Sequence, residues 1–244
     1  MQETKSILVK FGDFLFKYRN ILFPVFLILI CCIRPPVNEY DGKEYFEQIK
    51  DVFALLVMAL GLGIRAAVIG YKYIKRGGLN KKVYAENLVT DGFFATCRNP
   101  LYVGNMVMYL GIFLMHGDPL VIAIGMGVFF FIYTAIIAAE EYFLRNKFGT
   151  SYEAYCRDVP RWLPHLARLK GATEGMQFNW GRVIAKDYTT IVNGLFSLLV
   201  IECWEQLQWN EIIHWEVVAG LVVGFVAMLY FVKRAKKRGL FGAV

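Results

Sequence analysis

The sequence is poor in charge and has no metal-binding pattern. Only 19% of its 244 residues are charged, whereas about a quarter of a soluble domain is charged. Its three histidines are scattered, and its five cysteines form no CxxC pair or His/Cys cluster, so we expect no metal site. No nucleic-acid recognition motif accompanies the net charge of +7, so we expect no nucleic-acid partner. The sequence also shows no internal repeat and no low-complexity segment.

Apolar residues dominate instead. They make up 57% of the chain, with a mean hydropathy of +0.44, which is typical of membrane proteins. We predict an all-α, polytopic membrane helical bundle with about six transmembrane helices. An amphipathic helix over residues 5–20 leads into the first span, and residues 34–51 form a polar segment after it. The apolar runs lie at residues 21–33, 52–73, 101–116, 120–139, 188–201 and 216–232.

The distribution of basic residues predicts the topology. Four segments carry 23 of the 27 Lys and Arg residues, namely 1–19, 71–100, 139–187 and 233–244. Because cytoplasmic loops are rich in Lys and Arg, we expect a multi-pass protein of a bacterial inner membrane with both termini in the cytoplasm. We divide the chain into an N-terminal part (1–85), a core (86–187) and a C-terminal helical pair (188–244).

Two polar motifs flank the third and fourth spans. Residues 98–104 read RNPLYVG, and Pro100 suits the first turn of a helix because its missing N–H would be unpaired there. The free N–H groups that follow favour anionic or hydroxyl-rich ligands. Glu140 and Glu141 end the fourth span, so we expect the two motifs at one membrane face. We also expect Glu141 to pair with Arg145 at i,i+4.

Arg65 lies inside the second apolar run. A charge within a span is costly and marks a candidate functional site. The alternative is that Arg65 snorkels or pairs with a carboxylate, and the sequence favours neither interpretation.

The chain resembles a known family between residues 86 and 164. The run LVTDGFF at 88–94, the motif at 98–104, the Glu pair and the trailing residues up to 164 are similar to the isoprenylcysteine carboxyl methyltransferases. The phospholipid N-methyltransferases share this pattern more loosely. The resemblance implies transfer of a methyl group from S-adenosylmethionine to a lipidic substrate at the cytosolic membrane face.

The resemblance also implies a cofactor site. A sulfonium is attracted to aromatic faces, and an amino group or ribose hydroxyl needs an acceptor such as a carboxylate. We take Glu141 and Arg98 as candidate catalytic groups. In the family pattern, the cofactor's adenine is held by the backbone at Leu88 and Val89, and the rest of the cofactor is lined or held by Phe94, Asn99, Pro100, Leu101, Tyr102 and Glu140.

Two positions depart from the family pattern. Asn99 stands where the family usually has His, and Asn cannot carry a proton at neutral pH. Ile136 stands where the carboxyl methyltransferases place an Arg that faces the substrate. Since Arg suits a carboxylate through its bidentate fork, this difference argues against a prenylcysteine carboxylate as substrate. We take Ile136 and Arg65 as candidate substrate-binding residues, with Arg65 as a possible replacement for the missing Arg.

We therefore predict a membrane methyltransferase that acts on a lipidic or small apolar substrate and is surrounded by membrane lipids. One alternative is an NADPH-dependent reductase of the sterol-reductase type, which shares a similar proline-tyrosine-glycine region. The other is a non-catalytic membrane protein that kept the fold. The oligomeric state does not follow from the sequence.

Overall fold

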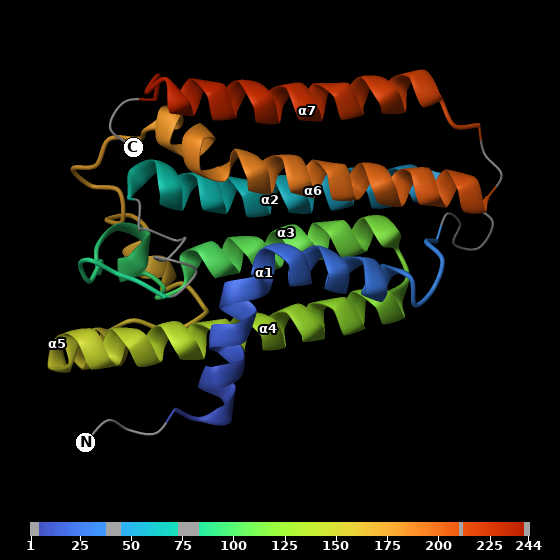
Figure 1. Ribbon diagram of the computed structural model, residues 1–244. Coiled ribbons are helices and arrows are strands. Elements are labelled where there is room, and N and C mark those ends of the chain that lie inside the picture. The colour runs from blue at the N-terminus through green and yellow to red at the C-terminus, as the bar shows by residue number, and fades with distance from the viewer. Residues whose placement is uncertain (1–4, 38–44, 73–82, 210–211, 242–244) are drawn as a thin grey trace.

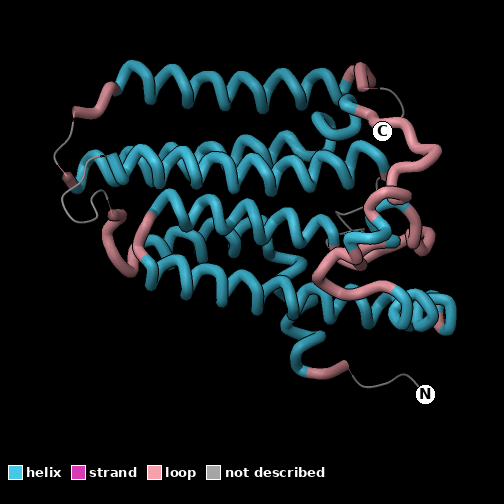
Figure 2. The backbone as a smooth tube through the Cα atoms, turned by 180° about the vertical axis from the view of Figure 1, so that it is seen from behind, coloured by secondary structure: helices cyan, strands magenta, loops and turns pink. Residues whose placement is uncertain are grey.

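Helices are the regular secondary structure of the described part of the chain, and loops connect them. The computed structural model describes residues 5–37, 45–72, 83–209 and 212–241, and these ranges contain no strand (Figures 1 and 2), which confirms the predicted all-α class. Two short 3-10 helices lie at Gly92–Ala95 and Leu166–Arg168. The α-helices of these ranges are α1 (Ile7–Cys31), α2 (Tyr45–Tyr71), α3 (Pro100–His116), α4 (Pro119–Phe148), α5 (Thr150–Asp158), α6 (Trp180–Gln208) and α7 (Trp215–Lys237).

Helices α2, α3, α4, α6 and α7 and the C-terminal half of α1 run back and forth along a common direction (Figure 1). Five helices of the described ranges are long and apolar enough to cross a membrane, namely α1, α2, α4, α6 and α7. Helix α3 is also apolar but has 17 residues and covers only about 25 Å at 1.5 Å per residue. The chain is thus a multi-pass integral membrane protein. We call the end that carries α5 and residues 92–99 the site end, and the other the opposite end.

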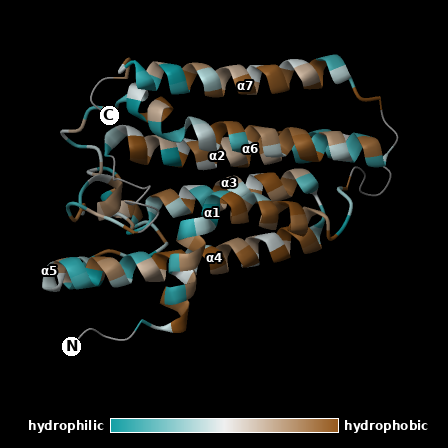
Figure 3. Cartoon of the chain, in the orientation of Figure 1, coloured by the Kyte–Doolittle hydropathy of each residue, from teal (hydrophilic) through white to brown (hydrophobic). Residues whose placement is uncertain are grey.

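The hairpin between α3 and α4 forms as predicted. Pro100 occupies the first turn of α3, and Gly117 ends the helix with φ +81°, a left-handed conformation that favours glycine. Asp118 caps α4, because its Oδ1 accepts hydrogen bonds from the backbone N–H groups of Leu120 and Val121 at 2.9 and 3.0 Å. Helix α4 then continues beyond the apolar run. Its last turns, like the short helix α5 that follows, are largely hydrophilic (Figure 3).

Helices α2 and α3 pack very closely. A Cβ atom on Gly61 would lie 2.5 Å from the backbone N of Met108, and one on Gly111 would lie 2.6 Å from that of Met58. Only residues without a Cβ allow the two backbones to approach so far, as is usual for small residues in membrane helix pairs. The close fit fixes α3, and with it the motif at its N-terminus, against α2.

Two expected helix boundaries at the N-terminal side are different in the structure. The predicted amphipathic helix and first span form one helix, α1, which bends (Figure 1) and contains Pro24, a usual cause of kinks. Helix α2 begins at Tyr45, so the second half of the predicted polar segment 34–51 belongs to a span. The basic loop predicted around Arg76 lies outside the described residues.

Helix α6 also begins earlier than the predicted start at Tyr188. Asn179 caps it by accepting a hydrogen bond from the backbone N–H of Arg182 at 2.8 Å. The Arg182 side chain in turn donates to the carbonyl of Gly70 at the end of α2. These contacts let the helix start at Trp180 and bring Asp187 inside it.

Candidate functional site

The loop before α3 is fastened to the segment after α5. The backbone N–H of Arg98 donates to the Pro160 carbonyl at 2.9 Å, and that of His165 donates to the Thr96 carbonyl at 2.8 Å. The Asn99 side chain adds a bond from Nδ2 to the backbone carbonyl of Arg161 at 3.0 Å. These contacts join two segments that lie 62 residues apart in the chain into one unit at the site end.

Glu141 lies at the centre of this unit. Its Oε1 accepts a hydrogen bond from Arg161 Nε at 2.9 Å and lies 3.2 Å from Arg98 Nη2, while its Oε2 contacts Arg161 Nη2. The hydrogen bond to Glu141 raises the pKa of the Arg161 guanidinium above its usual value. The predicted pairing of Glu141 with Arg145 is wrong, because the Glu141 carboxylate points inward to the two arginines of the loop segments, whereas Arg145 is exposed.

Glu140 has different neighbours from Glu141. The Tyr102 hydroxyl donates to Glu140 Oε1 at 2.8 Å, and the Tyr102 ring lies 5.0 Å from that of Tyr133 between centroids. A carboxylate has about four lone-pair positions, so Glu140 keeps acceptor capacity beside this one bond. The adjacent carboxylates thus differ: Glu141 fastens the loop, and Glu140 is held by a tyrosine of the predicted cofactor motif.

An apolar cluster lies on the other side of the loop. Phe94 and Leu101 are buried together with Val183 of α6, and Val89 packs against them. The Tyr155 hydroxyl donates to the backbone carbonyl of Phe94 at 2.7 Å. The structure therefore places the predicted cofactor-binding residues at one end of the bundle; they are Leu88, Val89, Phe94, Asn99, Pro100, Leu101, Tyr102 and Glu140.

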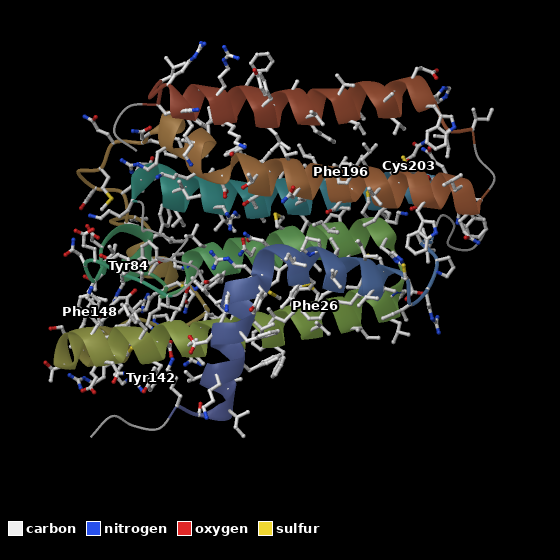
Figure 4. All side chains as sticks on the ribbon, in the orientation of Figure 1. Phe26, Tyr84, Tyr142, Phe148, Phe196 and Cys203 are labelled. Atoms are coloured by element: carbon white, nitrogen blue, oxygen red, sulfur yellow. The ribbon has the colours of Figure 1, made fainter. Side chains whose placement is uncertain are left out.

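The segment before this loop lies against the end of α4. Lys147 Nζ is 5.3 Å from the centroid of the Tyr84 ring and 5.4 Å from that of Phe148, and it bonds to the Ala85 carbonyl. Figure 4 shows Tyr84 and Phe148 together at the site end, whereas Phe196 and Cys203 lie further along α6. The chain entering the loop is thus also attached to the helix that carries Glu140.

Arg65, a candidate substrate-binding residue, pairs with a carboxylate. Its Nε donates to Asp187 Oδ2 at 3.0 Å, its Nη2 contacts Asp187 Oδ1, and its Nη1 donates to the Asn105 side-chain oxygen. The structure thus shows the second of the two interpretations that the sequence left open. Ile136, the other candidate, is 1% exposed within the apolar core.

Sequence reasoning missed Asp187 as the partner of Arg65. It placed this residue outside the C-terminal helical pair, in a long basic region. The signal that was available is the cost of an unpaired charge inside a span, which requires an acidic partner somewhere in the bundle.

A second buried ion pair joins α2 and α6 at the opposite end. Lys50 Nζ contacts both carboxylate oxygens of Glu205 at 2.9 Å and donates to the Val37 carbonyl at 2.7 Å. Near it, oxygen atoms of Glu47, Asp51 and Glu202 lie within 4.8 Å of one another. Lys50 Nζ is 3.5 Å from Asp51 Oδ1, so the lysine ammonium already provides a positive charge beside this group of acids.

The residues at the site end fit S-adenosylmethionine in their chemistry. Glu140 can accept hydrogen bonds from an amino group or a ribose hydroxyl, and the neighbouring rings of Tyr102 and Tyr133 provide aromatic faces beside it. Arg98 Nε is buried without a hydrogen-bond partner among the described residues, and a ligand carboxylate would satisfy this donor. These groups offer both an acceptor and a donor to an amino-acid end of a ligand.

Comparison with known proteins confirms the resemblance seen in the sequence. Residues 49–151 match the phospholipid methyltransferase family. The chain is 36% identical over 144 residues to the protein-S-isoprenylcysteine O-methyltransferase of Schizosaccharomyces pombe, covering 57% of this chain and 58% of the relative. It is 32% identical over 117 residues to the cobalt-zinc-cadmium resistance protein CzcN of Cupriavidus metallidurans, covering 48% and 53%. The chain thus spans little more than half the length of these relatives. No solved structure matches it.

Proposed function

We propose that this chain, a member of the family of membrane methyltransferases that includes the phospholipid and isoprenylcysteine enzymes, transfers a methyl group from S-adenosylmethionine to a lipidic or small apolar substrate. The observation that carries the proposal is the paired arrangement of Tyr102 and Glu140 beside the fastened loop. It places a carboxylate acceptor next to aromatic rings, which is what an amino group and a sulfonium require.

The chain's own residues bind and align the reactants. S-adenosylmethionine, when bound, supplies an activated methyl group, so the protein mainly has to position two molecules. In this proposal Glu140 and Tyr102 hold the polar end of the cofactor, and Glu141 keeps Arg98 and Arg161 in place. Arg98 and Glu141 were predicted as catalytic groups; their mutual contact supports a role in shaping the site.

A prenylcysteine carboxylate is a poor match for the residues around Arg65. Ile136 offers no charge, and the Arg65 guanidinium already contacts both oxygens of Asp187. A substrate carboxylate would therefore be desolvated without a partner. We propose that the accepting group is a different one, on a lipid or small apolar molecule.

The arginines of the loop also favour methyl transfer over NADPH-dependent reduction. The extra phosphate of NADPH would need several Arg or Lys side chains, since a phosphate carries up to two negative charges. Arg161 and the Nη2 of Arg98 are engaged by Glu141, and the Nη1 of Arg98 donates to the Cys156 carbonyl. The Arg98 Nε that remains is a single donor, which is too few for a phosphate.

The experiment that separates these functions is isothermal titration of the purified protein with S-adenosylhomocysteine and, separately, with NADPH. Binding of S-adenosylhomocysteine alone supports the methyltransferase. Binding of NADPH alone would replace it by the reductase, and binding of neither ligand by a folded protein would favour the non-catalytic alternative. Turnover of a farnesylcysteine analogue with radiolabelled S-adenosylmethionine would refute the proposed substrate restriction.

We also propose that the site end faces the cytoplasm, because described parts of the basic segments, residues 83–100, 139–187 and 233–241, lie there. Single cysteines at Leu240 and Ile33, in a background in which the native cysteines are replaced, test this. An impermeant thiol reagent added to intact cells should label position 33 and miss position 240. The reverse pattern would invert the topology.

A further inference from the structure

A buried polar network crosses four helices inside the bundle. Asp187 on α6 pairs with Arg65 on α2, and Arg65 also contacts Asn105 on α3 and Thr190 on α6, the latter at 3.3 Å. The hydroxyl of Tyr133 on α4 lies beside the Asn105 side chain. Arg65 is 3% exposed and Asp187 is 1% exposed, so bulk water does not solvate either charge.

This network leads to the proposed cofactor site. Asn105 follows Tyr102 by three residues, which places both side chains on one face of α3. Tyr133 contacts Asn105 at one side, and its ring lies 5.0 Å from that of Tyr102 at the other. Tyr102 donates to Glu140. A continuous series of side-chain contacts therefore connects Asp187 to Glu140.

Gly104 shows how tightly Arg65 is confined between α2 and α3. A Cβ atom on Gly104 would lie 2.7 Å from Arg65 Cγ and 3.1 Å from the Gly61 carbonyl oxygen. The Arg65 side chain thus has little room to move away from Asn105. The groups that contact the guanidinium determine its orientation, and among the described residues Asp187 is the charged one.

We propose that Asp187 is a positioning residue for the cofactor site: it aims Arg65, which holds Asn105 and Tyr133 and so fixes Tyr102 and Glu140. The inference rests on the proposed function. It assigns α6 a part in the site, although α6 lies beyond residues 49–151, the segment that matches the family.

The Lys50–Glu205 pair provides a matched control. It joins the same two helices, and its side chains are similarly buried, 9% and 1% exposed against 4% and 2% for Arg65 and Asp187. It lies at the opposite end, away from Tyr102. A variant of Glu205 therefore measures what the loss of an α2–α6 ion pair does without touching the network.

The test compares four variants of the full-length protein in detergent: Asp187→Asn, Asp187→Glu, Glu205→Gln and the double variant Arg65→Met/Asp187→Leu. We expect the double variant to fold even if Asp187→Asn does not, because replacing a buried ion pair by apolar residues of similar volume is often neutral or stabilising. Titration with S-adenosylhomocysteine gives the affinity, thermal unfolding gives the stability, and hydrogen exchange of peptides covering residues 92–102 gives the order of the loop.

We expect Asp187→Asn and the double variant to lose at least tenfold in affinity and to exchange faster in residues 92–102. Asp187→Glu should recover part of the affinity, and Glu205→Gln should stay within twofold of the parent protein. Parent-like affinity and exchange in the folded double variant would overturn the positioning role. A parent protein that fails to bind S-adenosylhomocysteine would instead refute the proposed function, and the exchange of residues 92–102 would still decide whether Asp187 orders the loop.

Discussion

The two ends of the α2–α6 interface both contain a buried ion pair, but the two pairs differ in their further contacts. Each end has one buried ion pair, Arg65–Asp187 at the site end and Lys50–Glu205 at the opposite end. Arg65 extends its contacts to α3 through Asn105 and, by way of Tyr133, to α4. Lys50 contacts the Val37 carbonyl, close to the end of the bundle.

The difference follows from the cations themselves. Arg presents five donors in a planar fork, so it can bind a carboxylate with two nitrogens and still reach a third group, whereas Lys is a compact point charge. Arg65 therefore links three helices directly, and Lys50 closes one end of one helix pair. A buried ion pair becomes part of a site only when its cation has further N–H donors, beyond those bound to the carboxylate, that reach residues of that site.

The largest expected effect is a loss of stability when the carboxylate of one buried ion pair is removed. Asp187→Leu leaves Arg65 buried without its carboxylate and should destabilise the fold by about 3–5 kcal/mol. Glu205→Leu should cost less, because Lys50 keeps the Val37 carbonyl and Asp51 as neighbours. Thermal unfolding in a single detergent measures both.

The double variants serve as controls for this difference. Arg65→Met/Asp187→Leu and Lys50→Met/Glu205→Leu remove both charges of a pair and should regain most of the lost stability. If the single and double variants are equally unstable, packing and not charge determines the cost. If Glu205→Leu loses more stability than Asp187→Leu, then the Arg65–Asp187 pair does not contribute more to the stability of the fold than the Lys50–Glu205 pair.

Glu140→Ala should have the next largest effect, and on ligand binding. It removes a charged hydrogen-bond acceptor from the proposed cofactor site, so binding of S-adenosylhomocysteine should weaken by about 1.5–3 kcal/mol. Glu205→Gln changes an acid at the opposite end and should leave binding unchanged. Isothermal titration measures both, and equal affinity of Glu140→Ala and the parent would remove Glu140 from the site.

Much of this arrangement was accessible from the sequence. The proline after Asn99, the Glu pair and the apolar runs predicted the third and fourth spans and their meeting at one face, because each is a local signal. The inward turn of Glu141 was not predictable in the same way. It depends on Arg98 and Arg161, which come close only after α5 has folded back.

The ion pairs between α2 and α6 were missed for a related reason. Lys50 and Asp187 stand just outside the apolar runs, so a hydropathy reading assigned them to polar segments. In the structure both lie inside helices, where a distant partner offsets the cost of their charge. The partner of Arg65 is 122 residues away in the sequence, and no pattern of spacing connects them.

Two glycines of α3 extend the comparison to the packing of α2. Alanine at Gly111 would meet backbone atoms, Met58 N at 2.6 Å and the Ala54 carbonyl oxygen at 2.8 Å. Alanine at Gly104 would meet the side chain of Arg65. Such overpacking costs about 1–3 kcal/mol, and we expect Gly111→Ala to lose more stability, while Gly104→Ala loses more affinity for S-adenosylhomocysteine. Thermal unfolding and titration of both variants decide this, and the opposite ranking would contradict the proposed role of Arg65.

The smallest expected effect concerns a third ion pair, Asp158–Arg168, which lies in solvent. Arg168 Nη2 is 2.9 Å from Asp158 Oδ1, but the two side chains are 67% and 37% exposed. The hydrogen bond from Arg168 lowers the pKa of the Asp158 carboxyl below its usual value.

This lowered pKa determines how the pair depends on pH. A carboxyl whose pKa is lower in the folded state stabilises the fold at pH values above its unfolded pKa, and this contribution is lost as the pH falls through the folded pKa. Since water and salt screen an exposed pair, Asp158→Asn should leave the melting temperature at pH 7 unchanged within error. A marked drop would show that this exposed pair, like the buried Arg65–Asp187 pair, holds segments of the site end together.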